Sequence, residues 1–261
     1  MMPAPCVIAR TLPGRLWRTS ARWVQGVIFP IAMTATAFRY IGVGVYSLPE
    51  AERLSGISRL RIRRWMEGRD AHASDQRHRV EPIIMSDIGR VAGQLALTFA
   101  DLLEVRFLDA FLAVGVKWSE IRSAAMVART LIGSTHPFSA KMFKTDGRYI
   151  LAEIADANGS LSLLRLSRNQ FELRIVSSML FAGIEFDGDE PSRWRPPAGR
   201  GSVIIDPRRS FGAPIVAEGV PTSILAASAR AERSQREAAR IYEVSRLAVR
   251  HAVAFERSLL Q

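Results

Sequence analysis

The sequence predicts a mainly α-helical fold with small β elements, which places the chain in the α+β class. Two segments near opposite ends of the chain combine a helix N-terminal capping box with apolar residues at helical spacing. Between them, apolar residues recur every three or four positions, and one Asn-Gly pair separates two short apolar segments. Because 48% of the 261 residues are hydrophobic and 23% are charged, the chain can bury a sizeable core.

Residues 1–37 are predicted to be a basic N-terminal extension, either disordered or absent from the native protein. Residues 1–39 contain five arginines and no acidic residue. The apolar segment from Val24 to Met33 is interrupted by Gly26 and Pro30 and is too short to span a bilayer. Three interpretations remain open: a secretory signal, a disordered basic arm, or a start codon assigned upstream of a true start at Met33. We expect residues 1–32 to be dispensable.

Residues 38–96 predict two short helices joined by a tight turn. In Ser47-Leu-Pro-Glu50, the serine oxygen can accept the N–H of Glu50, and the glutamate carboxylate can reach back to Ser47. Gly56 permits the turn, and Ser58 is placed to cap the second helix. This arrangement is typical of a helix-turn-helix.

The second of these helices is strongly basic. At about 100° per residue, Ile62 and Trp65 can face the core while arginines project outward. The segment 59–65 contains four arginines and no acid: Arg59, Arg61, Arg63 and Arg64.

The same pattern recurs near the C-terminus, where Ser234-Gln-Arg-Glu237 forms a second capping box. Both copies fit S-x-x-E-A-x-x-[LI]-x-x-[IV]-S-x-x-x-x-R, with every position offset by 187 residues. The second copy has Glu243 where the first has Gly56, so its turn can differ. An ordinary pair of capped amphipathic helices is the alternative interpretation. Residues 202–261 are therefore predicted to be a C-terminal helical, helix-turn-helix-like domain.

Residues 97–186 are predicted to form a middle region of helices and one β-hairpin. Apolar residues at helical spacing predict a helix from Phe99 to Val114, and a further helix opens at Ser119 and ends near Gly133. Residues 149–154 and 161–166 flank Asn158-Gly159, which predicts a hairpin. His136 before Pro137 is predicted to be structural. Residues 187–201 are predicted to be a linker, followed by a short strand at 203–205.

The charge of the chain favours a polyanionic partner. Lys+Arg total 36 against 25 Asp+Glu, giving a net charge of +11, and with only three lysines 33 of the 36 are arginines. Codon bias can explain the Arg:Lys ratio, but not the net excess of positive charge. Basic chains bind nucleic acids because neutralising phosphates releases condensed counterions.

No recognisable catalytic, cofactor or metal motif is present in the sequence. Gly42-Val-Gly44 lacks the third glycine of a dinucleotide fingerprint, and no phosphate-binding P-loop occurs. The single cysteine and four scattered histidines do not make a zinc motif, and the acidic residues at 187–190 lack calcium-loop spacing. We therefore expect a cytoplasmic protein that is not an enzyme and has no cofactor, no metal and no membrane contact.

Several spaced motifs carry a resemblance to a known family. From Val45 to Trp65 the chain looks like a MerR-type helix-turn-helix. The later motifs are Leu97 to Arg106, His136-Pro137-Phe138, Thr145 to Arg148, Trp194-Arg195-Pro196, Asp206 to Gly212, Gly219 to Thr222 and Phe255-Glu256-Arg257. Over residues 38–261 the chain resembles VapB-type antitoxins with a MerR-like N-terminal winged helix-turn-helix and a small C-terminal helical domain.

The resemblance implies a DNA-binding antitoxin of a type II toxin–antitoxin system. Such a protein would neutralise a PIN-like ribonuclease toxin, repress their shared operon by binding double-stranded promoter DNA, and act as a homodimer. In a MerR-like module the second helix enters the major groove and a β-wing contacts the backbone. Carried onto this sequence, the groove or phosphate residues are Ser58, Arg59, Arg61, Arg63 and Arg64. The wing residues are Arg77, His78 and Arg79, ahead of a strand expected at Ile83-Ile84.

In the C-terminal unit, Arg246 and Arg250 are candidates for a second nucleic-acid or partner contact. The helix that carries them has an apolar stripe of Ala248, Ala252, Phe255 and Leu259, which suits either a partner helix or the domain's own core. We expect this unit to make protein contacts more than it reads DNA.

Two other functions remain open. The first is a ligand-responsive MerR-like regulator without a toxin partner, in which the middle region forms an effector pocket. The second is an adaptor that uses both helix pairs only for protein contacts. An adjacent gene for a small PIN-like protein favours the antitoxin, and salt-dependent promoter binding excludes the adaptor.

Overall fold

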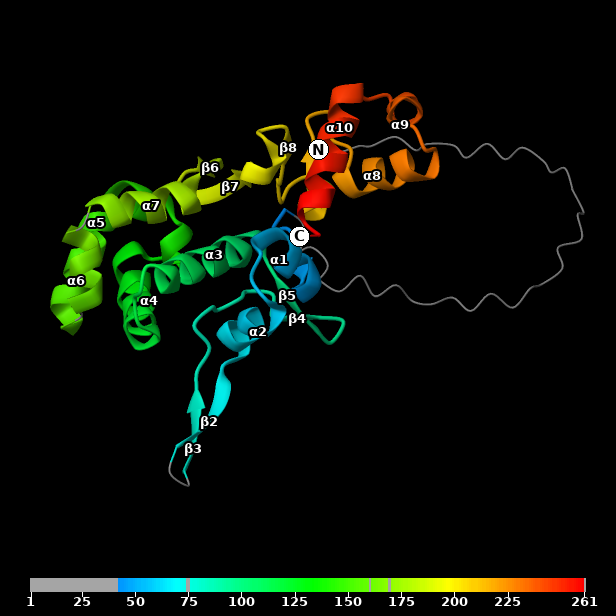
Figure 1. Ribbon diagram of the computed structural model, residues 1–261. Helices are drawn as coiled ribbons and strands as arrows, with labels where there is room; N and C mark the ends of the chain where they lie inside the picture. The colour runs from blue at the N-terminus through cyan, green and yellow to red at the C-terminus, as the bar shows by residue number, and fades with distance from the viewer. Residues whose placement is uncertain (1–41, 74–75, 160, 169, 261) are drawn as a thin grey trace, which may run out of the picture. The chain divides into compact units, whose positions relative to one another are not determined.

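The computed structural model describes residues 42–73, 76–159, 161–168 and 170–260 (Figure 1). The predicted extension at residues 1–37, including Met33, lies outside the described residues. Helices dominate, with small antiparallel sheets, so the prediction of an α+β fold is confirmed. The assignment of particular helix-turn-helix domains stays a prediction.

The N-terminal part contains two short helices and five short strands. In order these are β1 (Tyr46–Ser47), α1 (Leu48–Ser55), α2 (Arg59–Glu67), β2 (Arg69–Ala73), β3 (Gln76–Val80), β4 (Arg90–Val91) and β5 (Gln94–Leu97). Strand β5 lies between β1 and β4 in one sheet, and β2 pairs with β3 in another. The strand expected at Ile83-Ile84 is wrong: both residues are buried in a bend, and both backbone N–H groups donate to the Trp65 carbonyl.

The middle part is a set of five helices: α3 (Phe99–Ala113), α4 (Trp118–Ile132), α5 (Lys141–Asn158), α6 (Leu161–Arg168) and α7 (Gln170–Phe181). Helix α3 begins at a capping box between Thr98 and Asp101, and α4 ends at Gly133 in the left-handed region. Phe107 and Phe111 of α3 are buried against Phe138 and Phe143, with ring centroids 5.1–6.1 Å apart. The two predicted helices at 99–114 and 119–133 are confirmed.

The hairpin predicted around Asn158-Gly159 is wrong. Residues 149–154 lie inside α5, and Gly159 ends this helix with φ +64° while its N–H donates to the Ala155 carbonyl. Ile150, Leu151 and Ile154 are buried at helical spacing, so tertiary packing favours the helix. An Asn-Gly pair serves either structure, because both a hairpin turn and a helix C-cap need a positive φ.

A hairpin occurs instead at residues 184–194, within the stretch where a linker was expected to begin. Strand β6 (Ile184–Asp187) pairs with β7 (Glu190–Trp194), and a short 3-10 helix η3 (Pro197–Gly199) follows. Strand β8 (Val203–Ile204) confirms the predicted short strand and pairs with β9 (Ile215–Val216), while a second 3-10 helix, η4 (Ser210–Gly212), lies between them. A β-bridge between Trp194 and Ile205 joins the two hairpins.

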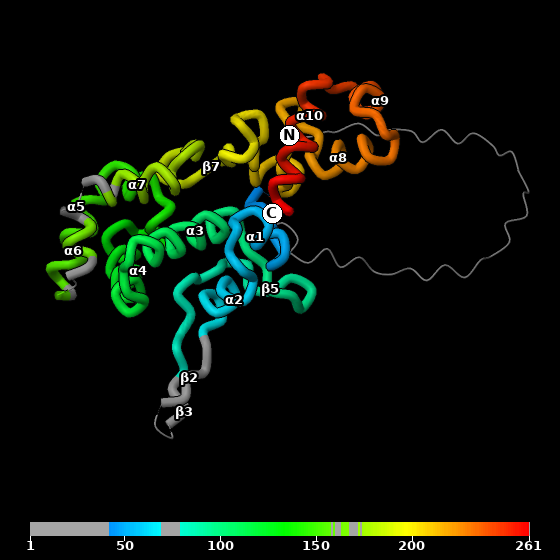
Figure 2. The backbone as a smooth tube through the Cα atoms, viewed as in Figure 1, coloured from blue at the N-terminus to red at the C-terminus, as the bar shows by residue number. Residues whose placement is uncertain are grey.

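The C-terminal part contains α8 (Thr222–Ala231), α9 (Gln235–Ile241) and α10 (Arg246–Ser258), which can be followed in the backbone trace (Figure 2). These helices enclose a second small core that includes Leu225, Ala238 and Val249. Tyr46 Oη donates to the Gly212 carbonyl at 2.8 Å, and Arg53 lies 2.8 Å from Glu256. The first and last parts of the described chain therefore contact each other directly.

No helix among the described residues is both long and apolar enough to cross a membrane.

Candidate nucleic-acid interface

The turn between α1 and α2 has the geometry that the sequence predicts. Ser47 and Glu50 exchange both capping-box hydrogen bonds, and Gly56 ends α1 at φ +75° with its N–H donating to Glu52. Ile57 then enters the core. Ser58 lies at the start of α2, but its side chain caps nothing. The side chain of Glu52 takes that role, because its Oε1 accepts the N–H of Arg59 at 3.0 Å.

Helix α2 is fixed from behind by apolar contacts. Ile62, Trp65 and Met66 are buried, and the rings of Trp65 and Trp118 stack with centroids 5.9 Å apart. This stacking attaches α2 to Trp118, the first residue of α4. The opposite face of α2 carries exposed residues at 59, 60, 63 and 64.

The four arginines of α2 are not equivalent. Arg61 is the most constrained, because its guanidinium lies 2.8 Å from Asp109 and 5.1 Å from the centre of the Trp65 ring. Arg59 and Arg63 lie 3.8 and 3.9 Å from Glu52 and Glu67, at the long end of ion-pair distances. Arg64 is exposed and has no ion pair with any residue that the structure describes.

The predicted wing residues lie on β3 of the hairpin that follows α2. In this hairpin Arg77 is opposite His72, His78 is opposite Ala71, and Arg79 is opposite Asp70. The side chain of Arg79 is exposed, 3.9 Å from Glu81. The structure thus places Arg77, His78 and Arg79 on the second strand of the hairpin that follows α2.

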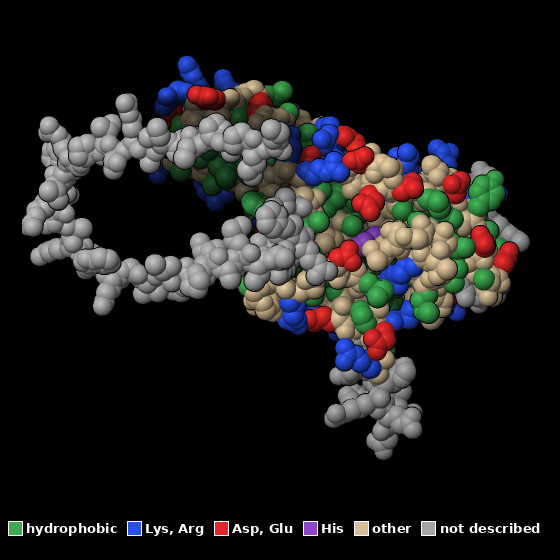
Figure 3. All heavy atoms as spheres, turned by 180° about the vertical axis from the view of Figure 1, so that it is seen from behind, with side chains coloured by type: hydrophobic (Ala, Val, Ile, Leu, Met, Phe, Trp, Pro, Cys, Tyr) green, Lys and Arg blue, Asp and Glu red, His purple; other side chains and the backbone are tan. Residues whose placement is uncertain are grey.

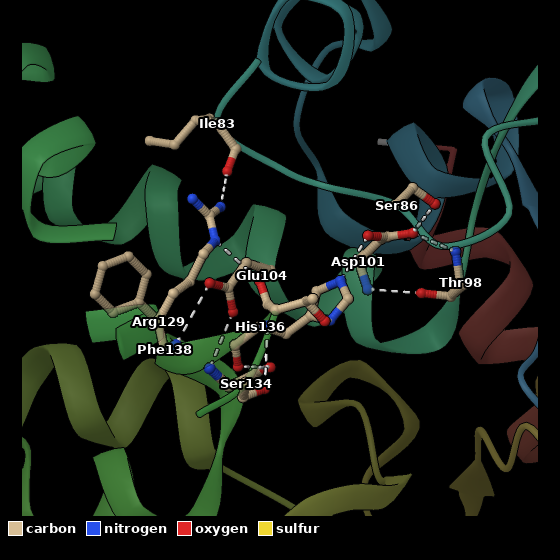
Figure 4. Close-up of polar contacts among 11 residues, drawn as sticks. Ile83, Ser86, Thr98, Asp101, Glu104, Arg129, Ser134, His136 and Phe138 are labelled. Atoms are coloured by element: carbon tan, nitrogen blue, oxygen red, sulfur yellow. Dashed lines mark hydrogen bonds and ion pairs between the residues drawn. The ribbon is translucent and has the colours of Figure 1, made fainter. Parts of the chain in front are cut away.

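A buried polar cluster joins α3 to residues 136–139 and was not anticipated from the sequence. Asp101 and Glu104 are one turn apart on α3, and Figure 4 shows the His136 ring directed at Asp101. His136 Nε2 lies 2.7 Å from Asp101 Oδ1, and Glu104 accepts the backbone N–H groups of Phe138 and Ser139. Two acids within the apolar stretch 99–105 were the available signal.

This cluster connects the segment after the β2–β3 hairpin to helices α3 and α4. Ser86 Oγ donates to Asp101, and the Arg129 guanidinium donates to the Ile83 carbonyl. Burial raises the pKa of Glu104 to about 7, whereas His136 lowers the pKa of Asp101 against the effect of burial. Burial also works against protonation of His136, but the hydrogen bond and charge of Asp101 raise its pKa.

In the C-terminal unit, Arg246 and Arg250 are exposed on α10. The apolar stripe on the same helix closes the unit's own core, because Ala248, Ala252 and Phe255 are buried. Because the stripe is buried in the unit's own core, it gives no support for a partner helix on this face of α10. Basic side chains are spread over the face drawn in Figure 3 and are mixed with acidic ones, so that face has no single positive patch.

Among the described residues, no group of three or more His, Cys, Asp or Glu side chains is placed to hold a metal ion.

The comparisons with known proteins give a distant relative and a similar fold. No protein-family model matches the chain. The chain is 25% identical over 184 residues to a Mycobacterium tuberculosis (strain ATCC 25618 / H37Rv) protein named "Putative antitoxin VapB45", covering 66% of this chain and 77% of that protein. The crystal structure of Rv2018 from M. tuberculosis is similar with a TM-score of 0.64 and 24% identity, covering 82% of this chain and 99% of that one. The sequence match supports a distant relationship to VapB-type antitoxins, and the structural match shows a shared fold.

Proposed function

We propose that this protein is a DNA-binding antitoxin of a type II toxin–antitoxin system. It binds double-stranded DNA of its own promoter as a homodimer, represses that operon, and neutralises a PIN-like ribonuclease toxin. It is a binding protein rather than an enzyme. The toxin partner is inferred from the similarity to VapB45, and the DNA contact from the surface of α2 and the hairpin that follows it.

The DNA-binding proposal rests on the exposed face of α2. Ile62 and Trp65 hold the helix on the protein, which leaves Arg63 and Arg64 directed at solvent. Arginine is the commonest side chain to read guanine in the major groove, and it also contacts phosphates. Leu60, 63% exposed in the first turn, offers an apolar contact of the kind that thymine methyl groups accept.

The contacts of Arg61 assign it a different role within the proposal. Its ion pair with Asp109 and its contact with Trp65 tie α2 to α3 and to its own buried tryptophan. Arg61 therefore positions the reading helix, while Arg59, Arg63 and Arg64 supply contacts to DNA. The long ion pairs of Arg59 and Arg63 are of the weak exposed kind and can exchange for phosphates at little cost.

A reporter gene placed behind the native promoter tests the repression. The wild-type protein is expected to lower reporter output, and Arg63→Ala/Arg64→Ala is expected to relieve that repression. The matched control is Arg148→Ala/Arg174→Ala, which removes two exposed arginines from α5 and α7. Equal repression by all three proteins would refute the assignment of α2.

Co-expression with the adjacent PIN-like gene tests the toxin partner. The toxin alone should arrest growth, and the wild-type chain should restore growth and co-purify with the toxin. Absence of such a gene, or growth arrest that persists with both proteins present, would contradict the antitoxin function while leaving DNA binding intact.

A ligand-responsive regulator is the second candidate, favoured by one cavity. This cavity has a volume of about 230 Å³, and its lining includes Thr98, Ser134, Thr135 and His136. It adjoins the polar cluster that connects the wing segment to α3. A small molecule that releases the protein from promoter DNA, with no toxin gene nearby, would favour this function.

A further inference from the structure

The helix pair α9–α10 repeats the backbone geometry of α1–α2. The turn residue has a positive φ in both, +75° at Gly56 and +52° at Glu243, although the second is not a glycine. A serine precedes the second helix in each case, and Ser245 Oγ accepts the N–H of Ala248. A residue other than glycine in the left-handed region costs free energy, so the backbone at Glu243 destabilises the folded C-terminal copy.

Burial follows the same offset of 187 residues. Ala51 and Ala238 are both fully buried, as are Ile62 and Val249 on the second helices. The side chains that hold α2 in place therefore have counterparts that hold α10. The two second helices therefore bury corresponding positions, although exposed Arg61 corresponds to buried Ala248 and Arg64 corresponds to His251.

The exposed faces also correspond. Each second helix begins with Ser-Arg-Leu, and the leucines are 63% exposed at Leu60 and 49% exposed at Leu247. Arg63 corresponds to Arg250, and both are exposed. An apolar residue beside arginines in the first turn is thus a repeated surface feature and not a single occurrence.

The arginines of the second surface, like Arg64 but unlike the other arginines of α2, are free of ion pairs with the described residues. Arg246 and Arg250 form no ion pair with any residue in the described part of the chain, and neither does Arg200. Arg200 and Arg250 line one hollow of about 140 Å³ together with His251. Unpaired cations at such a hollow repel one another, and a polyanion relieves that repulsion.

Two acids limit how DNA can approach this surface. Glu218 accepts the backbone N–H and the hydroxyl of Ser245, at 3.3 and 3.1 Å, so it occupies the N-terminal end of α10. Glu243 is exposed in the preceding turn. A phosphate must therefore be bound by the guanidinium groups and not by the helix N-terminus, which favours a weaker contact than that of α2.

We propose that Arg200, Arg246 and Arg250 form a second binding surface for the phosphates of duplex DNA. Each chain then carries two DNA contacts, one on α2 and one on α10. This inference rests on the proposed DNA binding by α2, because the assignment of α10 relies on its similarity to that helix.

Promoter affinity at several salt concentrations tests the inference with the full chain. We expect Arg246→Ala/Arg250→Ala to weaken binding about tenfold and to reduce the salt slope by about two per chain, since each lost phosphate contact removes roughly one. The control Arg230→Ala/Arg236→Ala removes two exposed arginines from α8 and α9 and should change both quantities less. Glu243→Gln should strengthen binding, because it removes an acid from the surface.

The outcomes separate this inference from the proposed function. If Arg63→Ala/Arg64→Ala weakens binding while Arg246→Ala/Arg250→Ala and Glu243→Gln change nothing, the second surface is wrong and the first stands. If the α10 variant instead loses only toxin co-purification, this face binds protein and the inference is overturned. If the wild-type chain binds no DNA, both proposals fall.

Discussion

Glu104 is the residue whose environment departs most from its ordinary chemistry. Its carboxyl is buried on α3 near His136 and Asp101, and its pKa is raised from 4.5 to about 7 by burial. With Asp101 ionised and His136 protonated, a neutral Glu104 leaves these three side chains without net charge, and the Arg129 guanidinium adds a positive charge near Glu104. Raising the pH removes the Glu104 proton and places a second carboxylate charge in the core, where the cost of desolvation exceeds the attraction of the nearby cations.

The pH dependence of stability follows from this shift. A carboxyl whose pKa is higher in the folded state stabilises the fold below its unfolded pKa and loses that contribution as the pH rises through the folded value. Between pH 4.5 and about 7 the loss is at most about 3 kcal/mol. The raised pKa of His136 continues the decline above 6.5, and the lowered pKa of Asp101 makes stability fall below about pH 3.8.

Urea denaturation of the wild type and of Glu104→Gln measures this effect. The variant is expected to be less stable at pH 5, because the amide cannot accept both N–H groups that Glu104 accepts. Its free energy of unfolding should nevertheless fall less between pH 4.5 and 7 than that of the wild type. Parallel curves over this range would show that Glu104 titrates normally.

The turn residues Gly56 and Glu243 allow backbone strain to be compared between the two helix pairs. Gly56 has φ +75° and no heavy atom near the position of an added Cβ, so Gly56→Ala tests backbone strain alone. We expect it to cost about 1 kcal/mol. Glu243→Gly relieves strain in the folded state but adds freedom to the unfolded chain, so its expected effect is a gain of up to about 1 kcal/mol.

Thermal unfolding of both variants checks the prediction, with Ala254→Gly as a control inside α10. Glycine at that exposed helical position should cost about 1 kcal/mol. If Glu243→Gly were as destabilising as Ala254→Gly, then the positive φ at 243 would not be strained.

Local sequence signals predicted the elements that local chemistry determines. The capping box at 47–50, the glycine at 56 and apolar periodicity predicted α1, α2, α3 and α4, because each signal acts within a few residues. The hairpin at Asn158-Gly159 failed because both a turn and a helix end use that pair, and only packing decides between them. The cluster of Asp101, Glu104 and His136 was missed because it joins residues 35 positions apart.

For the candidate nucleic-acid interface too, the sequence predicted local features but not long-range contacts. The sequence identified the arginines of α2 and α10, since charge and exposure are readable from composition and helical period. It did not show that Arg61 pairs with Asp109 while Arg64 has no such partner among the described residues, because those contacts depend on how α2 packs on α3.

At the scale of the whole molecule, residues 202–261 are tied to the rest of the described chain. Trp194 pairs with Ile205, and the buried Tyr46 donates its hydroxyl hydrogen bond to Gly212. A truncation ending at residue 201 therefore exposes two aromatic side chains that are 2% and 3% exposed in the intact chain.

We expect that truncation to cost at least about 3 kcal/mol, since burying each aromatic side chain contributes about 1.5–3 kcal/mol. Urea denaturation against a control ending at residue 258 measures the difference. Equal stability of the two shortened chains would mean that residues 202–258 fold independently of the rest.

Promoter affinity as a function of salt tests whether α2 is a DNA-binding helix. Fluorescence anisotropy of a labelled promoter duplex should give a steep loss of affinity between about 50 and 200 mM salt for the wild type. Arg63→Ala/Arg64→Ala should bind at least about tenfold more weakly with a shallower slope, while remaining folded and unlike the Arg148→Ala/Arg174→Ala control. The same affinity and slope in all three proteins would show that α2 is not the DNA-binding helix.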